Sequence, residues 1–200
     1  MILYHRDDCP FCWKCRIAFA YAGTALDYVD VERGTAHPEV AKLSATATIP
    51  VLVNNKTVIT QSGVLLEYIN EAFCNGTLLP SGASQRAKVR ELCAYSDNVI
   101  GKSLRGLVFE RRDKVTADQN PDIISQSDKQ WRECLDYLDA KIVGPFFLEE
   151  FSMADCALLP RFALAARYDS AVDGRHPNAL RYWKEASQTK CFLSSSSDHN

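Results

Sequence analysis

The chain has 200 residues, of which 46% are hydrophobic and 24% are charged, and its formal net charge is −2. This composition supports a packed core, and the absence of a Lys/Arg-rich run gives no indication of attraction to nucleic acid or to a membrane surface. Met1 leads directly into ILYH without a signal-peptide pattern, and no apolar run is long enough to span a bilayer. We therefore expect one large domain or two small ones in a cytoplasmic protein that binds neither nucleic acid nor membrane.

The first part of the chain alternates between strand and helix patterns. Alternating or short apolar runs indicate strands, and apolar residues three or four apart indicate helices. In chain order, the predicted elements are a strand at residues 1–5, a helix at 11–22, a strand at 25–32, a short helix at 39–43, a hairpin of strands 51–53 and 57–59, and a helix at 62–73. Ser62 is the candidate N-cap of that last helix. The order predicts an α/β domain with a small mixed sheet and helices packed against it.

A stretch that combines Gly, Pro and Ser, at about residues 74–85, predicts a linker between two domains. Beyond it the apolar residues keep a helical spacing, and no segment has a convincing strand pattern. We therefore predict an α/β domain at residues 1–74 and an all-helical domain at residues 86–192.

Two features of the helical part are specific enough to predict in detail. Ser152 with Asp155 three residues later indicates an N-cap with an acidic form of the capping box. A last helix is expected at about residues 178–187. The Ser-rich tail, residues 194–200, is expected to be disordered.

The segment RDDCPFCWKCR, residues 6–16, places Cys9 and Cys12 directly after the first strand and at the start of the first helix. A helix N-terminus favours a thiolate through its free N–H groups and its dipole, and Pro10 suits the first turn because it has no N–H. The pKa of such a thiol can fall from about 8.5 to roughly 3.5–7.5. We therefore interpret Cys9 as a nucleophile and Cys12 as the thiol that resolves a mixed disulfide.

A third cysteine, Cys15, completes the cluster. It would lie about 9 Å along the helix from Cys9, which is too far for a disulfide without distortion. Packing is the favoured role, because a free cysteine is among the most commonly buried residues. The same interpretation applies to the dispersed cysteines, which are Cys74, Cys93, Cys134, Cys156 and Cys191.

The clustered cysteines also raise the question of a metal site. Zinc and iron–sulfur sites need four ligands, but the next cysteine is Cys74 and no Cys/His pair has zinc spacing. His5 is interpreted as a strand-end residue rather than a ligand. We therefore expect no metal site, with one alternative open: a cluster held between protomers by redox cysteines and bound glutathione.

Four motifs follow one another in the chain: CPFC after the first strand, TIP before the hairpin, QSGVLLEYI at a helix start and FSMADCALLP in the helical part. In this order the chain resembles the glutathione transferase superfamily from Met1 to about Phe192. The resemblance implies a thioredoxin-like N-terminal domain and an all-α C-terminal domain. The CPFC motif is most similar to glutaredoxins, especially the two-domain kind, and next to cysteine-type transferases such as the omega class. It implies that Cys9 is the nucleophile and Cys12 the resolving cysteine.

The resemblance also implies a glutathione site. Pro50 in TIP would be the cis-proline of the fold, and the backbone of Ile49 would pair with the cysteinyl part of glutathione. Gln61 and Ser62 would hold the γ-glutamyl group, with Gln61 in place of the usual Glu. Asp155 would be the structural capping residue of the helical domain.

Together these observations lead us to expect a glutathione-dependent thiol–disulfide oxidoreductase of the glutaredoxin type. Glutathione would be the cosubstrate, and small-molecule or protein disulfides would be the substrates. Two alternatives stay open: a glutathione S-transferase that conjugates electrophiles, and a regulatory or interaction protein without enzymatic activity. The protein would be a monomer if it follows the two-domain glutaredoxins and a homodimer if it follows the transferases.

Overall fold

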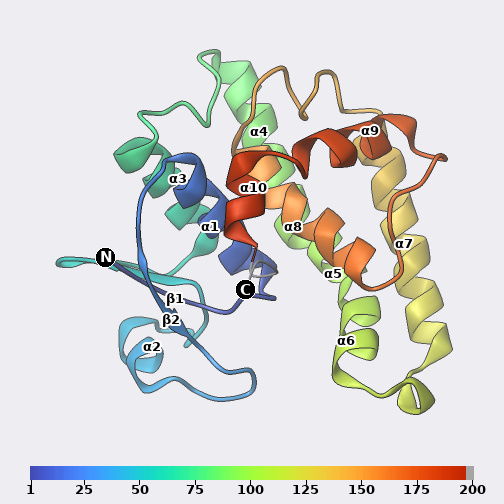
Figure 1. Ribbon diagram of the computed structural model, residues 1–200, viewed down its shortest axis with the longest axis horizontal. Coiled ribbons are helices and arrows are strands. Elements are labelled where there is room, and N and C mark those ends of the chain that lie inside the picture. Colours follow the sequence, from blue (N-terminus) through green and yellow to red (C-terminus); the bar gives the residue numbers. More distant parts are fainter. Residues whose placement is uncertain (197–200) are drawn as a thin grey trace. The chain divides into compact units, whose positions relative to one another are not determined.

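A computed structural model describes residues 1–196 and divides the chain into two compact units (Figure 1). Unit 1 contains Met1–Leu79 and the chain from Thr189 onward, and unit 2 contains Pro80–Gln188. The helical domain expected at residues 86–192 differs from this division at its C-terminal end, because the last helix belongs to unit 1. Among the described residues, no helix is both long and apolar enough to cross a membrane.

Unit 1 is built on a four-stranded mixed sheet with the strand order β2-β1-β3-β4. Its elements are β1 (Ile2–His5), α1 (Pro10–Tyr21), β2 (Asp27–Asp30), α2 (Pro38–Leu43), β3 (Val51–Asn54), β4 (Thr57–Ile59), α3 (Ser62–Phe73) and α10 (Lys190–Ser195). Strand β1 is parallel to β2 and antiparallel to β3, and β3 and β4 form the predicted hairpin. The predicted order of strands and helices up to α3 is confirmed.

The core of unit 1 lies between the sheet and the helices α1 and α3. Leu3, Leu52, Ile17 and Leu65 are fully buried, so each of these elements contributes apolar side chains to one core. Burial of such side chains contributes about 1.5–3 kcal/mol each. Helix α1 ends where Gly23 takes a left-handed conformation with φ of 65°, which glycine adopts without steric cost.

Helix α10 packs on α1, although the two are far apart in the sequence (Figure 1). The rings of Trp13 and Phe192 stack with centroids 5.4 Å apart, and Trp13 Nε1 donates to Ser195 Oγ at 3.0 Å. The expectation of a disordered tail is therefore wrong for Ser194 and Ser195, which belong to α10. Residues 197–200 lie outside the described residues.

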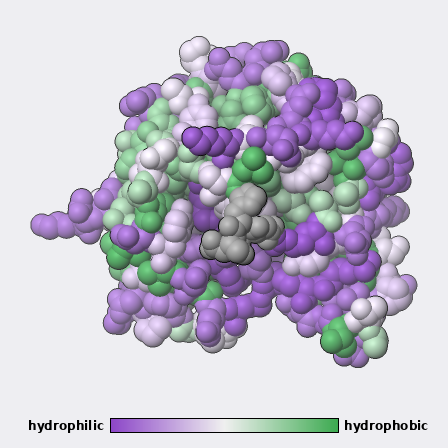
Figure 2. Space-filling view, viewed as in Figure 1, coloured by the Kyte–Doolittle hydropathy of each residue, from purple (hydrophilic) through white to green (hydrophobic). Residues whose placement is uncertain are grey.

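Unit 2 has helices as its only regular elements among the described residues, in agreement with the predicted all-helical domain. Its elements are α4 (Ala83–Tyr95), the π-helix η1 (Ser96–Ile100), α5 (Gly101–Ser103), α6 (Arg105–Asp113), the 3₁₀-helix η2 (Thr116–Asp118), α7 (Pro121–Asp139), α8 (Met153–Arg167) and α9 (Pro177–Ala186). Trp131, Phe162 and Tyr182 form an aromatic core, and the indole N–H of Trp131 donates to Ser170 O at 3.0 Å. Figure 2 shows hydrophilic and hydrophobic residues interspersed on the face it presents.

The N-terminus of α8 is fixed by the predicted capping box. Asp155 is fully buried and accepts hydrogen bonds from the N–H of Ser152 at 2.8 Å, its Oγ at 2.8 Å and the N–H of Phe147 at 3.2 Å. Burial raises the pKa of Asp155 to about 6, although these donors favour the carboxylate. The structural role predicted for Asp155 is confirmed, and no substrate chemistry needs to be assigned to it.

Candidate redox site

The CPFC motif lies where the sequence places it, between β1 and α1. Cys9 is the N-cap of α1 with an extended backbone, and Pro10 is the first helical residue. The carbonyl of Cys9 accepts hydrogen bonds from the N–H groups of Cys12 and Trp13 at 3.0 and 2.8 Å. Cys9 is 8% exposed and Cys12 is fully buried. Cys9 thus keeps a small exposed fraction, whereas Cys12 lies one turn further along the helix with none.

The two thiols differ strongly in acidity. The Cys12 thiol donates a hydrogen bond to Cys9, and this bond is the main reason why the pKa of Cys9 falls from 9.0 to about 6. Burial opposes the fall, whereas the N–H groups of Cys12 and Phe11 and the charge of Arg6 assist it. Burial and the same bond to Cys9 hold the pKa of Cys12 well above 9.0. At neutral pH the pair therefore combines a Cys9 thiolate with a protonated Cys12.

The charges next to Cys9 are arranged in favour of this thiolate. Asp8 would oppose it, but its carboxylate accepts from Arg6 Nε at 2.7 Å and also pairs with Arg33. Arg6 and Arg33 also line a cavity of about 320 Å³. Arg33 is distant from the CPFC motif in the sequence, and no sequence pattern predicts that it pairs with Asp8.

The residues expected to bind glutathione lie at two other segments of unit 1. The Ile49–Pro50 peptide bond is cis, as the resemblance implies. Because Val51 pairs with Tyr4 across the sheet, Ile49 and Pro50 precede β3 at the same sheet edge at which β1 leads into the CPFC loop. The partly buried side chain of Ile49 packs against a core cluster of Val31, Val40 and Val51.

Gln61 and Ser62 lie at the start of α3. Gln61 occupies the N-cap position and Ser62 is the first helical residue, so the prediction that Ser62 is the N-cap is wrong by one position. The carbonyl of Gln61 accepts from the N–H of Leu65 at 2.8 Å, which is the first turn of the helix. The free N–H groups of this turn suit a carboxylate.

Cys15 is fully buried on α1, as expected for a packing residue. Its Sγ lies 3.4 Å from Phe11 O and 3.8 Å from Ser62 O, which brings α1 next to the start of α3. Burial raises the pKa of Cys74 to about 11, so this thiol is poorly reactive. None of the eight cysteines, all of which lie in the described part of the chain, forms a disulfide.

Outside the cysteine motif, one group of potential metal ligands occurs within residues 1–196. His5, Asp7 and Asp30 have ligand atoms within 4.8 Å of one another. However, Arg16 Nη1 lies 3.0 Å from His5 Nδ1 and 3.5 Å from Asp7 Oδ1. The guanidinium already supplies the positive charge at this place, so the group is a poor cation site.

The fold and the site define unit 1 as a thioredoxin-like domain that carries a dithiol at the start of its first helix. Residues 3–76 match the family model described as glutathione S-transferase, N-terminal domain. The chain is 27% identical over 205 residues to glutathione S-transferase L2, a chloroplastic protein of Arabidopsis thaliana. That match covers 98% of this chain and 66% of the relative, so the chain spans just under two thirds of that protein.

Solved structures agree on the fold. The match to a glutathione S-transferase from Rhodospirillum rubrum covers 100% of this chain and 93% of that transferase, with a TM-score of 0.89 and 22% identity. A theta-class glutathione S-transferase from Xanthomonas axonopodis, solved with glutathione bound, covers 98% and 96% of the two chains with a TM-score of 0.87 and 17% identity. At these identities the structures show the fold alone. Together with the domain match at residues 3–76, they show that the chain has the fold of the glutathione transferases.

Proposed function

We propose that the protein is a cytoplasmic glutathione-dependent thiol–disulfide oxidoreductase with Cys9 as nucleophile and Cys12 as resolving thiol. The observation that carries the proposal is the acidity difference within CPFC, in which a Cys9 thiolate accepts a hydrogen bond from a protonated Cys12. A thiolate with a pKa near or below ambient pH is the attacking species in thiol–disulfide exchange. Eight cysteines without a disulfide suit a reducing compartment.

The reaction begins when the Cys9 thiolate attacks one sulfur of a mixed disulfide between glutathione and a substrate. The substrate leaves as a thiolate and takes up a proton, and Cys9 is left joined to glutathione. A second glutathione thiolate can then attack this adduct, which restores the Cys9 thiolate and releases glutathione disulfide. In total, one mixed disulfide and one free glutathione give one glutathione disulfide and the free substrate thiol.

Cys12 offers a second route from the same adduct. Burial raises the pKa of Cys12 most, and the hydrogen bond and charge of the Cys9 thiolate raise it further; this second contribution is lost once Cys9 is bonded to glutathione. Cys12 can then lose its proton and attack Cys9, which forms the Cys9–Cys12 disulfide and releases glutathione. Two further glutathione molecules reduce that disulfide. With a protein disulfide as substrate, Cys9 first forms a mixed disulfide with one protein sulfur and frees the other as a thiol. Cys12 then attacks Cys9 in the same way, which forms the Cys9–Cys12 disulfide and releases the protein as a dithiol.

Glutathione is proposed to bind along the sheet edge that leads to Cys9. The Ile49 backbone next to Pro50 would pair with its cysteinyl part, and Gln61 and Ser62 at the start of α3 would hold the γ-glutamyl group. The shared sheet edge and the free N–H groups at the α3 start support this placement. The bound glutathione in the theta-class relative supports glutathione as the cosubstrate.

The second candidate is a glutathione S-transferase that conjugates electrophiles, and the similarity to proteins named glutathione S-transferases favours it. Conjugation requires an activated glutathione thiolate and does not require a second protein thiol. The two candidates therefore differ in what they demand of Cys12.

The test is glutathione-coupled disulfide reduction by wild type, Cys9→Ser, Cys12→Ser and the buried control Cys15→Ser. We expect Cys9→Ser to lose activity and Cys12→Ser to keep reduction of glutathione mixed disulfides while losing reduction of protein disulfides. Cys15→Ser should behave like wild type when folded. Full activity of Cys9→Ser would refute the proposal, and turnover of an aromatic halide that is indifferent to Cys12→Ser would favour the transferase.

A further inference from the structure

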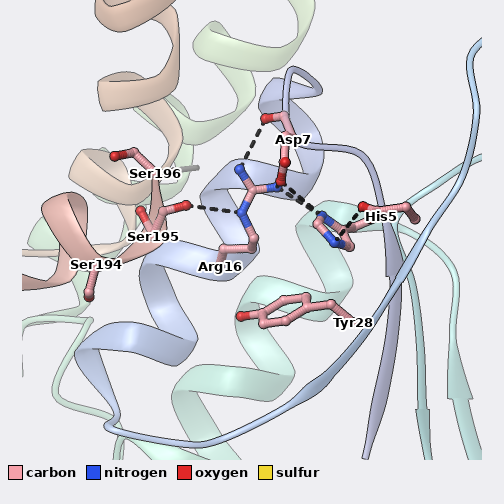
Figure 3. Close-up of a pocket in the computed structure, with 8 residues that line it drawn as sticks. His5, Asp7, Arg16, Tyr28, Ser194, Ser195 and Ser196 are labelled. Carbon is pink, nitrogen blue, oxygen red and sulfur yellow. Dashed lines mark hydrogen bonds and ion pairs between the residues drawn. The ribbon is translucent and has the colours of Figure 1, made fainter. Parts of the chain in front are cut away.

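Arg16 is a buried arginine on α1 that ties three separate segments of unit 1 together (Figure 3). Its Nε donates to Ser195 O at 3.1 Å, and Nη2 donates to Asp7 O at 3.0 Å. Nη1 donates to Arg6 O at 3.2 Å and contacts His5 Nδ1 at 3.0 Å. One guanidinium thereby bonds to the end of β1, to the loop before the CPFC motif and to the end of α10.

The loop held in this way is the one that carries the nucleophile. The carbonyl of Arg6 accepts both from Arg16 and from the backbone N–H of Cys9, the latter at 3.2 Å. The side chain of Arg6, in turn, contributes to the low pKa of Cys9. The position of Arg6 is thus coupled on one side to Arg16 and on the other to Cys9.

Packing alone does not require a charge at this position. The stacked rings of Trp13 and Phe192 already join α10 to α1. A buried guanidinium costs several kcal/mol to desolvate, a cost that its hydrogen bonds must offset. The five donors of an arginine are arranged in a fixed fork, which lysine cannot reproduce. The four acceptors therefore identify a site that demands the shape of arginine as well as its charge.

The other charged and titratable groups around Arg16 fit this role. His5 accepts from Arg16 through Nδ1, so the neutral ring carries its proton on Nε2, which faces Asp30 Oδ1 at 3.2 Å. The Asp7 carboxylate lies 3.5 Å from Arg16 Nη1 and is half exposed. These groups and Tyr28 line a cavity of about 290 Å³ together with Ser194, Ser195 and Ser196.

We propose that Arg16 is a positioning residue of the redox site: its hydrogen bonds to the Arg6 and Asp7 carbonyls and to Ser195 of α10 hold the loop in the conformation in which Cys9 is reactive. Helix α10, at the far end of the sequence, then belongs to the redox site. The inference rests on the proposed role of Cys9 as nucleophile. It assigns no contact between Arg16 and the reacting sulfur atoms.

The test compares the pH dependence of Cys9 alkylation by iodoacetamide, located by peptide mass spectrometry, in wild type, Arg16→Met and Arg16→Lys. Wild type should show a midpoint near pH 6. A midpoint one pH unit higher lowers the thiolate fraction at pH 6 from about one half to about one eleventh, so we expect alkylation at pH 6 to fall about fivefold in Arg16→Met. Arg16→Lys should lie between the two, because it keeps the charge but loses the fork.

The matched control is Arg132→Met in unit 2. Arg132 also bonds to a carbonyl, Ala171 O at 2.8 Å, and to the Asp128 carboxylate at 3.3 Å, but it has no link to the CPFC loop. Its loss should leave the Cys9 midpoint unchanged. Should Arg16→Met fail to fold, Arg16→Lys decides the question.

The outcomes separate this inference from the proposed function. If wild type and Arg16→Lys both show a Cys9 alkylation midpoint near pH 6, charge alone suffices and the positioning role of Arg16 is overturned. It is also overturned if Arg16→Met has the same midpoint as wild type. Both results would leave Cys9 as the nucleophile. A wild-type midpoint at the value of an ordinary thiol would instead overturn the proposed function, and this inference with it.

Discussion

Replacement of Cys12 by alanine tests the origin of the low Cys9 pKa. The hydrogen bond from the Cys12 thiol is the largest contribution that lowers this pKa, ahead of the helix N–H groups and Arg6. Alanine removes the donor and leaves the rest of the helix N-terminus in place. Serine at the same position keeps a donor and is therefore the matched control.

The size of the effect follows from the strength of that hydrogen bond. The fall in the Cys9 pKa from 9.0 to about 6 corresponds to about 4 kcal/mol, at 1.36 kcal/mol per pH unit. A hydrogen bond to a charged group contributes about 1.5–3 kcal/mol, which is about one to two pH units. We therefore expect a Cys9 pKa of about 7–8 in Cys12→Ala. At pH 7 the thiolate fraction would drop from about nine tenths to between about one half and one tenth.

The assay is the thiolate absorbance in the near ultraviolet, titrated with pH in wild type, Cys12→Ala and Cys12→Ser, with Cys9→Ser as the baseline. Cys12→Ser should stay closer to wild type than Cys12→Ala. A midpoint that stays near 6 in Cys12→Ala would refute the reasoning, because the helix terminus and Arg6 would then be sufficient to stabilise the thiolate.

Two further predictions concern stability. Asp155→Asn should lower the free energy of unfolding, measured in urea, by about 1–3 kcal/mol, because an amide N–H₂ would face the two Ser152 donors. The difference in stability between wild type and Asp155→Asn should narrow as the pH rises from about 4 to about 6, since the raised pKa of Asp155 makes wild type less stable over that window. A difference that widens there would contradict the raised pKa of Asp155. Burial and Arg16 lower the pKa of His5 below 6.5, so its unfolded form takes up a proton first and wild-type stability should fall as the pH drops below about 6.5. His5→Asn keeps an acceptor for Arg16 but does not titrate. In urea unfolding experiments it should therefore flatten the dependence of the free energy of unfolding on pH below about 6.5. A pH dependence equal to that of wild type would contradict the lowered pKa of His5.

The order of elements in unit 1 could be predicted because each strand and helix carries its own local pattern. The hairpin, the end of α1 near residue 22 and the capping box of Asp155 all depend on residues within a few positions of one another. The bounds of α3 agree with the predicted helix, but its N-cap is Gln61 and not Ser62, because Gln61 makes no side-chain cap hydrogen bond that its residue type would signal. Helix α10 was not predicted, since its contacts with Trp13 join residues that are far apart in the sequence.

The candidate site likewise combines features that neighbouring residues determine with contacts between residues far apart in the sequence. The strand, Cys9, Pro10 and Cys12 are adjacent in the chain, so their arrangement at a helix N-terminus could be predicted. The contacts of Arg16 with Ser195 join residues 179 positions apart. No periodicity or spacing encodes such a contact, and only the folded chain reveals it.

The most direct measurement for the central claim is intact and peptide mass spectrometry of Cys12→Ser after incubation with glutathione disulfide. The account predicts one glutathione adduct per chain, located on Cys9, and its loss when Cys9 is also replaced by serine. An adduct that forms elsewhere, or its absence from Cys9 in the folded protein, would contradict the role of Cys9 as the nucleophile.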